Sequence, residues 1–416
     1  MATEMEALFS KALGIEDPWR ITKVSFDSLK KRLEIHVDFK RGATFSIEDE
    51  KTGETKEYKA YDTVEKTWRH LNFFEHECYL IARTPRIQPD GGGTKMVLPP
   101  WSGAVYGFTM LFEALILQMC LNMPVHQVGK ILKVSDRKLW HAIDCYVAKG
   151  MLEADYSEVK ALGMDETSLK KGHEYISLFV DLKEKKTIYV ERGKDHKVVL
   201  AFAEAFQDSN GDVETIKDVS CDMSPAFIKG VREAFPNAQI TFDKFHIIKL
   251  LNEAVDAVRR SEVKAVEALK GARYVVLKNE INLTKKQRET RARLSQMNLK
   301  TMKALHIREG FQEIYKANTF EDFESLLTQW LAWACRSRLD PIIKVAQTIK
   351  THWDGIVRWK KSQINNGILE GLNSVIQAAK RKARGYKFEH FKTMALLLTG
   401  KLNLKQFNPY LPTPFA

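Results

Sequence analysis

An apolar segment that ends in an aspartate, followed by two short β-type runs, constrains the fold of this chain more than any other feature. Residues 161–164 are Ala-Leu-Gly-Met, and Asp165 follows them. Residues 174–181 and 186–192 are rich in β-branched and aromatic side chains, and the charged turn between them is short, which is typical of a β-hairpin. We therefore expect Asp165 to lie on the first strand of a sheet that the hairpin extends.

Two later runs of strand character also lead into an aspartate. The run 216–221 precedes Asp222, and the run 238–242 precedes Asp243, three residues before His246. Open α/β sheets build their sites at the carboxyl ends of their strands. Strand, hairpin, helix and a second strand ending in a carboxylate is also the order in which a ribonuclease H-like core presents metal ligands. We expect such a core.

Residues 1–104 have a different pattern. The segments 31–38, 43–48 and 78–87 alternate apolar with polar residues, and a turn-rich patch follows at 89–93. An alternation of period two is typical of half-buried strands. We expect a small β-rich module here, and its residues include no ligand cluster or nucleophile–base pair from which chemistry could be predicted.

Residues 105–150 change to a helical pattern. A short helix follows Pro124, a tight turn follows it, and Ser135 can cap the next helix. This layout predicts a helix-turn-helix, although a plain three-helix packing unit would show the same pattern. A recognition helix meets base edges near its N-terminal end. The side chains that we expect to contact DNA there are Arg137, Lys138, Trp140 and His141.

Residues 247–352 are almost wholly helical in pattern and contain more Lys and Arg than Asp and Glu. We therefore expect an all-helical domain inserted into the α/β core, whose two parts would be 158–246 and 353–404, with a tail at 405–416. A basic excess is typical of a surface that follows phosphates, but a solvated helix face would have it too.

The last predicted helix, residues 365–384, has one apolar and one polar face, and Gly385 occupies the position of a left-handed cap. Its polar face begins with Glu370 and continues with cations that we expect to hold DNA phosphates, namely Lys380, Arg381 and Arg384.

Carboxylates on two strand ends and one late helix could act together. Asp165, Asp222 and Glu370 could hold two divalent cations about 3.5–4 Å apart, as phosphodiester chemistry requires. Mg²⁺ prefers oxygen ligands of this kind. We therefore expect two Mg²⁺ or Mn²⁺ ions per site.

Five stretches occur in an order and at a spacing that match a known family: Gly163–Thr167, Cys221–Phe227, Phe235–Ile247, Arg273–Asn279 and Glu370–Tyr386. On these stretches the chain resembles the DDE transposases of bacterial insertion sequences, specifically the ISL-three family. The segments 61–63 and 68–72 and the predicted helix-turn-helix also look like the N-terminal half of the family.

The resemblance implies that Asp165, Asp222 and Glu370 are the catalytic triad and the metal ligands. Asp243 and His246 resemble the Asp-x-x-His signature beside the active site of related transposases with a helical insertion, such as the Mutator and hAT transposases. The implied activity is binding of the terminal inverted repeats of an insertion sequence, followed by strand cleavage and strand transfer. The implied partner is double-stranded DNA, bound by a homodimer or higher oligomer.

One departure from the family concerns zinc. Members usually carry an N-terminal zinc module with paired cysteines, but the corresponding regions here, 45–55 and 86–95, contain none. The remaining candidate ligands, which lack the paired spacing of a zinc site, are Cys78, His36, His70 and His76. We expect a module without zinc, stabilised by aromatic packing of Trp68, Phe73, Phe74, Tyr79 and Trp101.

Composition limits the remaining alternatives. A formal net charge of +12 suits a polyanionic partner, and five scattered cysteines indicate no disulfide framework. No run reaches the roughly 18 apolar residues of a membrane span, and no signal peptide is evident, so we expect a bacterial cytoplasmic, nucleoid-associated protein. A nuclease or junction resolvase that cuts without joining and an inactive DNA-binding derivative remain open, although the three acids count against the latter.

Overall fold

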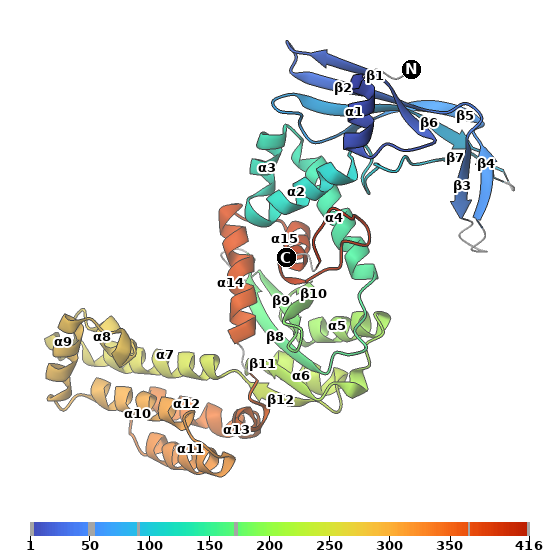
Figure 1. The fold of residues 1–416 in the computed structure, drawn as a ribbon. Helices are drawn as coiled ribbons and strands as arrows, with labels where there is room; N and C mark the ends of the chain where they lie inside the picture. The colour runs from blue at the N-terminus through green and yellow to red at the C-terminus, as the bar shows by residue number, and fades with distance from the viewer. Residues whose placement is uncertain (1–3, 49–54, 90–91, 170–173, 365–366, 414–416) are drawn as a thin grey trace. The chain divides into compact units, whose positions relative to one another are not determined.

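The computed structural model describes residues 4–48, 55–89, 92–169, 174–364 and 367–413, and the chain is a mixed α+β protein of several parts (Figure 1). It divides into two compact units. The first contains residues 1–154 and 376–416, and the second contains 155–375. Residues 376–404, which we expected to belong to the α/β core, are therefore grouped with the N-terminal residues.

A five-stranded sheet follows helix α1 (Glu4–Leu13) in the first unit, with the order β1-β2-β6-β5 and β7 paired to β6. Its strands are β1 (Trp19–Asp27), β2 (Arg32–Phe39), β5 (Asp62–Arg69), β6 (Glu77–Ile87) and β7 (Lys95–Met96). A separate hairpin consists of β3 (Thr44–Glu48) and β4 (Thr55–Lys59). The predicted strands at 31–38, 43–48 and 78–87 are confirmed by β2, β3 and β6, whereas β1, β4 and β5 were not predicted.

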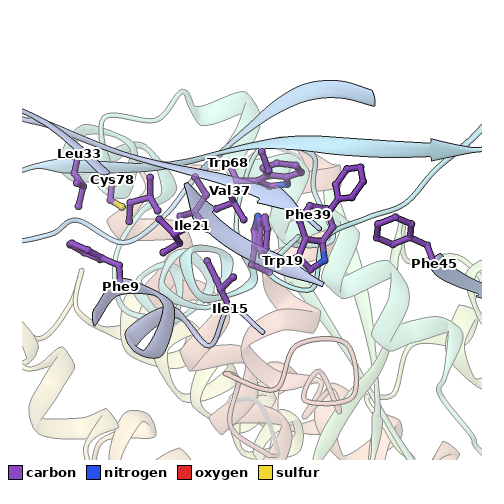
Figure 2. Close-up of a cluster of buried hydrophobic side chains, with 14 residues drawn as sticks. Phe9, Ile15, Trp19, Ile21, Leu33, Val37, Phe39, Phe45, Trp68 and Cys78 are labelled. Atoms are coloured by element: carbon purple, nitrogen blue, oxygen red, sulfur yellow. The ribbon is translucent and has the colours of Figure 1, made fainter. Parts of the chain in front are cut away.

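The core of this module is aromatic (Figure 2). The rings of Trp19 and Trp101 lie 5.2 Å apart, and those of Trp68 and Trp101 lie 6.0 Å apart, both edge to face. Burial of Trp68 and Trp101 was predicted correctly. The prediction was wrong for Phe73 and Phe74, which are 38% and 86% exposed. Both belong to a tight turn that two backbone hydrogen bonds close at Phe73 and His76, and Phe74 adopts a left-handed φ of 51°.

Two of the four side chains that were weighed as zinc ligands, Cys78 and His70, are buried and engaged in other contacts. Cys78 lies in the hydrophobic core, where burial raises the pKa of its thiol to about 12. His70 Nδ1 lies 2.9 Å from Thr109 Oγ1, and burial lowers its pKa to about 4. The absence of zinc stays a prediction.

Three helices follow the sheet: α2 (Met110–Asn122), α3 (Val125–Leu132) and α4 (Asp136–Leu152). The turn between α3 and α4 is tight because Lys133 adopts a left-handed φ of 54°, and a Cβ on Gly129 would lie 2.8 Å from the Val134 carbonyl oxygen. Ser135 stands at the start of α4, but its side chain makes no capping hydrogen bond, so that detail of the prediction was wrong.

A buried carboxylate connects these helices to distant segments. Glu113 on α2 accepts hydrogen bonds from the backbone N–H groups of Ala104 at 2.8 Å and Val105 at 2.7 Å, and from the Tyr146 hydroxyl at 2.7 Å. Asn408 donates to the same hydroxyl oxygen at 2.9 Å. The segment predicted as a tail thus contributes a buried side chain. The last helix of this unit is α15 (Phe388–Thr399).

The sheet of the second unit has the order β10-β9-β8-β11-β12. Its strands are β8 (Ala161–Ser168), β9 (Tyr175–Asp181), β10 (Lys186–Arg192), β11 (Asp218–Cys221) and β12 (Gln239–Phe242). Strands β8, β11 and β12 are parallel, and β9 is antiparallel to both of its neighbours. Two helices connect the later strands, α5 (His196–Asp208) and α6 (Pro225–Ala234). The five predicted strands are confirmed.

A run of helices then interrupts the α/β pattern: α7 (Lys244–Glu262), α8 (Arg273–Leu277), α9 (Lys285–Ser295), α10 (Lys300–Ile314), α11 (Phe320–Cys335) and α12 (Asp340–Thr351) (Figure 1). Short 3-10 turns are η1 (Val213–Thr215), η2 (Glu267–Leu269) and η3 (Glu280–Asn282). Helix α13 (Trp353–Ser362) returns to the sheet, where a Cβ on Gly355 would lie 2.5 Å from the ring of Phe242. The helical character predicted for 247–352 is confirmed.

Helix α14 (Gly367–Lys382) corresponds to the predicted helix 365–384. Residues 365 and 366 lie outside the described residues. The helix ends before Arg384, because Arg384 and Gly385 adopt left-handed φ values of 60° and 110°. Arg384 is therefore not on the helix face to which it was assigned.

In the described ranges, no helix is both long and apolar enough to cross a membrane.

We predict that Glu113→Ala lowers the free energy of unfolding by about 1–3 kcal/mol, because the substitution leaves the buried Val105 N–H and the half-buried Ala104 N–H without their acceptor. Denaturant titration of the full chain measures the change. Glu153→Ala, at an exposed position after α4, is the control and should alter stability by less than about 0.5 kcal/mol. Equal losses in the two variants would contradict an anchoring role for Glu113.

Candidate active site

Parallel pairing brings three aspartates to one edge of the second sheet. Gly163 on β8 pairs with Ser220 on β11, so Asp165 and Asp222 each lie two residues farther toward the carboxyl edge. Cys221 pairs with Phe242 on β12, so Asp222 and Asp243 each follow immediately. The register therefore sets the three carboxylates at the same level, as the strand-end positions in the sequence predicted.

Two of these carboxylates also fix the helices that follow them. Asp222 Oδ1 accepts a hydrogen bond from Ser224 N at 3.0 Å, at the start of α6. Asp243 Oδ1 accepts from Phe245 N at 2.9 Å, and its Oδ2 lies 3.2 Å from His246 Nδ1. A carboxylate at a helix N-terminus satisfies free N–H groups there, so the backbone holds both side chains at the sheet edge.

The third carboxylate, Asp165, forms a hydrogen bond with a residue of α14. Its Oδ1 accepts from Glu166 N at 2.8 Å, and its Oδ2 accepts a short hydrogen bond from Asn373 Nδ2. Asn373 lies one turn after Glu370 on α14, and its Oδ1 is buried without a hydrogen-bond partner. Sequence reasoning missed Asn373; its position one turn after a candidate catalytic acid was the only local signal.

The pKa of Asp165 is raised to about 6, chiefly by burial. The positive charge of His246 and the Glu166 N–H oppose this shift, and the charges of Asp222 and Asp243 add to it. The pKa of His246 is raised, chiefly by its hydrogen bond to Asp243. These mutual effects show that the four side chains form one electrostatic cluster. Like charges this close disfavour the ionised state of one another, so a cation in the cluster would be stabilised.

Glu370 reaches this region because α14 packs closely on the sheet. Leu369 belongs to a buried cluster with Val180 and Leu182. A Cβ on Gly163 would lie 2.9 Å from Leu182 Cδ2 and 3.1 Å from Leu369 Cδ1. The absence of a side chain at position 163 thus permits the contact that sets the position of Glu370.

A cleft of about 910 Å³ opens at this edge of the sheet. It is lined by the five predicted site residues, Asp165, Asp222, Asp243, His246 and Glu370, and it continues along α7. The structure therefore brings the five side chains to a common cavity within one compact unit.

The donor chemistry of this cleft fits Mg²⁺ or Mn²⁺, because carboxylate oxygens are hard ligands. The geometry is open, however: over the described part of the chain, no three His, Cys, Asp or Glu side chains are close enough together to hold one metal ion. The side chain of Glu370 is exposed, and Asp165 has both oxygens engaged by N–H donors. Metal binding would therefore need rotation of side chains in the cleft.

The predicted DNA contacts on α4 fall into two groups. Arg137, Lys138 and His141 are exposed. Trp140 instead stacks on His390, with ring centroids 3.7 Å apart and planes within 3°. One face of the Trp140 ring is covered by a residue of α15, which the sequence pattern could not reveal. A DNA contact by Trp140 stays a prediction.

The three cations near the end of α14 that were predicted to bind phosphates differ in their exposure to solvent. Lys380 is half-buried, and burial together with the charge of Arg381 lowers its pKa. Arg381 is exposed on the last turn of the helix, and Arg384 is exposed beyond its end.

We predict that Gly163→Val displaces α14 and lowers catalytic activity at least tenfold while destabilising the protein by about 1–3 kcal/mol, because overpacking forces neighbouring side chains apart. Activity assays with thermal unfolding measure both effects. In Gly371→Ala the new Cβ would meet nothing within 4 Å, so this control should unfold at the same temperature as the wild type or slightly higher. Unchanged activity of Gly163→Val would refute the close-approach argument.

Comparison with known proteins gives the chain its family. Residues 162–395 match the model of a family described as Transposase, and this match covers more than half of the chain and all five predicted cleft residues. The transposase for insertion sequence element IS1557 of Mycobacterium tuberculosis is 23% identical over 380 residues, which cover 83% of each chain. The transposase for IS1001 of Bordetella parapertussis is 25% identical over 346 residues, which cover 80% of this chain and 84% of the relative. The chain therefore belongs to the ISL-three family of DDE transposases.

Proposed function

We propose that this transposase binds the terminal inverted repeats of its insertion sequence and catalyses metal-dependent strand cleavage and strand transfer in the cleft beside β8, β11 and β12. The observation that carries the proposal is the common edge at which Asp165 and Asp222 meet in register, with Glu370 lining the same cleft. Both relatives are transposases of insertion sequences.

The topology supports a ribonuclease H-like core. An antiparallel strand, β9, lies between β10 and β8, and the parallel strands β11 and β12 continue the sheet on the other side. The helices α7 to α12 interrupt the core between β12 and the helix that carries Glu370. This arrangement agrees with the expected order of a core with an inserted helical domain.

Two Mg²⁺ or Mn²⁺ ions held by Asp165, Asp222 and Glu370 would supply activation of a water or 3′-hydroxyl nucleophile and stabilisation of the leaving oxygen. The protein's own groups prepare the site. Asn373 and the Glu166 N–H hold the Asp165 side chain at the cleft, and a metal ion would have to compete with these donors for its oxygens. Asp243 holds His246 through Nδ1, which directs its Nε2 away from Asp243 and places a positive charge beside Asp165 when the imidazole is protonated.

The first unit would supply recognition of the element ends. We assign α2, α3 and α4 as a helix-turn-helix, supported by the tight turn at Lys133 and by exposed Arg137 and Lys138 at the start of α4. Exposed Arg381 and Arg384 would add phosphate contacts. Because transposition acts on two ends, we propose a homodimer or higher oligomer on double-stranded DNA.

We predict that Asp165→Asn, Asp222→Asn and Glu370→Gln each reduce cleavage and strand transfer at least a thousandfold while specific binding to the element ends is retained, since only metal ligation is lost. Radiolabelled oligonucleotide assays with uncleaved and pre-cleaved ends separate the two reactions. Strand transfer that persists in Mg²⁺ would remove a residue from the triad. A wild-type protein that cuts but never joins a pre-cleaved end would instead be a nuclease.

For the helix-turn-helix, we predict that Arg137→Ala combined with Lys138→Ala weakens binding to the element ends by about 1–3 kcal/mol if one of the side chains reads a base edge. Competition binding against a random duplex of equal length measures the sequence-dependent part. An equal loss on both duplexes would show that these side chains contact only phosphates.

A further inference from the structure

Three arginines surround one carboxylate on the α7 side of the cleft. Asp256 Oδ1 accepts from Arg259 Nε at 2.9 Å and lies 2.8 Å from its Nη2. Asp256 Oδ2 lies 3.4 Å from Arg260 Nε and 3.8 Å from Arg273 Nε. Arg273 comes from α8 and the other two from α7, so two elements converge on the same side chain. We call these four residues the Asp256 cluster.

The cluster has more positive charge than its carboxylate can neutralise. Arg259 is 12% exposed and forms the closest ion pair with Asp256, whose side chain is 13% exposed. Arg260 and Arg273 are 67% and 56% exposed. Asp256 therefore restrains two largely exposed guanidinium groups, and the four charges sum to about +2. Positive charge that is held in place and open to solvent is suited to binding an anion.

The same cleft connects the cluster to the catalytic edge. One face of α7 is buried through Ile247, Leu251, Val255 and Val258. The opposite face lines the cleft with Phe245, Lys249, Asn252, Asp256 and Arg260, at successive spacings of four, three, four and four. Lys249 and Glu253 between the two ends carry opposite charges. The cleft thus has acidic groups at its catalytic end and a surplus of basic groups at the other.

The geometry of α7 gives the distance between the carboxylates at the sheet edge and the Asp256 cluster. Asp243 caps α7, and Asp256 follows 13 positions later in the sequence. At about 1.5 Å per residue this corresponds to about 20 Å along the helix. A strand of B-DNA advances by about 3.4 Å per nucleotide along its axis, so a backbone that follows the cleft would place at most about six nucleotides between the two ends.

We propose that Arg260 and Arg273, oriented by Asp256, bind a phosphate of the DNA strand whose scissile phosphate lies at Asp165 and Asp222, no more than about six nucleotides away. The inference rests on the proposed function and names the substrate contact made by the inserted helices. A guanidinium group matches a phosphate in shape and charge and can donate two parallel hydrogen bonds to it. Two such groups held by one carboxylate form a pre-oriented site.

The test pairs a protein variant with chemically altered DNA. The full-length protein and its Arg260→Ala/Arg273→Ala variant are titrated with element-end duplexes and, separately, with target duplexes. The duplexes form a series. Each contains a single uncharged methylphosphonate, and the series covers the eight positions on either side of the scissile phosphate. Binding is measured without divalent metal, so the result does not depend on catalysis.

In the wild type, we expect one methylphosphonate position within about six nucleotides to weaken binding about tenfold. The same modification should have no further effect in the variant. The slope of log affinity against log salt concentration should also become less steep by about one to two units. The duplex type that shows the effect identifies whether the phosphate belongs to the element end or to the target.

Two matched variants separate loss of the contact from loss of structure. Lys286→Ala/Arg288→Ala removes the same charge from exposed positions on α9 that do not line the cleft, and its salt slope should remain that of the wild type. Arg260→Lys/Arg273→Lys keeps the charge and should retain most of the slope. If wild type and alanine variant respond equally to all modified phosphates on both duplexes, the proposal is refuted. If the wild-type protein shows this methylphosphonate effect and the variant does not, but the wild type performs no strand transfer, the proposed reaction is wrong and the phosphate contact stands.

Discussion

The close approach of α14 to β8 is the contact on which the rest of the site depends. Gly163 has no side chain, so Leu369 packs against the strand together with Leu182. This contact joins segments separated by the whole inserted helical domain. It brings Asn373 within hydrogen-bond distance of Asp165 and places Glu370 in the lining of the cleft. A shift of α14 would therefore alter both the Asn373–Asp165 hydrogen bond and the position of Glu370, the proposed third catalytic acid.

The sheet edge that carries Asp165, Asp222 and Asp243 is rigid and concentrates negative charge. Asp222 accepts from the N–H of Ser224, the residue that precedes α6, and Asp243 caps the first turn of α7. These backbone hydrogen bonds restrain both side chains. Asp165 is buried near both, and its pKa is raised to about 6. Concentrating carboxylates in this way destabilises the unliganded cleft relative to one that contains cations. The exposed Glu370 is the member of the set with the most freedom to complete a coordination sphere.

Short sequence patterns predicted the structural features that depend on neighbouring residues, but not the contacts between residues far apart in the sequence. The strands of the second sheet and their terminal aspartates followed from apolar runs that stop at a charge, whereas Glu370 was assigned a catalytic role by family resemblance. Asn373 was missed because its partner, Asp165, lies 208 positions earlier. Phe74 was wrongly placed in a core because hydrophobicity does not show that a residue occupies the tip of a tight turn. The stacking of Trp140 on His390 likewise depends on two helices far apart in sequence.

Helix α7 fixes the distance between the helices that follow it and the carboxylates at the sheet edge. It begins at the cap formed by Asp243 and reaches the Asp256 cluster without interruption. Its apolar face is buried, and it packs against α10 and α12. Because an α-helix has a constant rise per residue, the distance between the carboxylates at the sheet edge and the arginines is set by the number of residues between them. A helical domain joined to the sheet by a flexible loop would not set such a distance. If the proposed phosphate contact holds, the continuous helix α7 would let the inserted helices position the substrate at a defined distance from the proposed catalytic carboxylates.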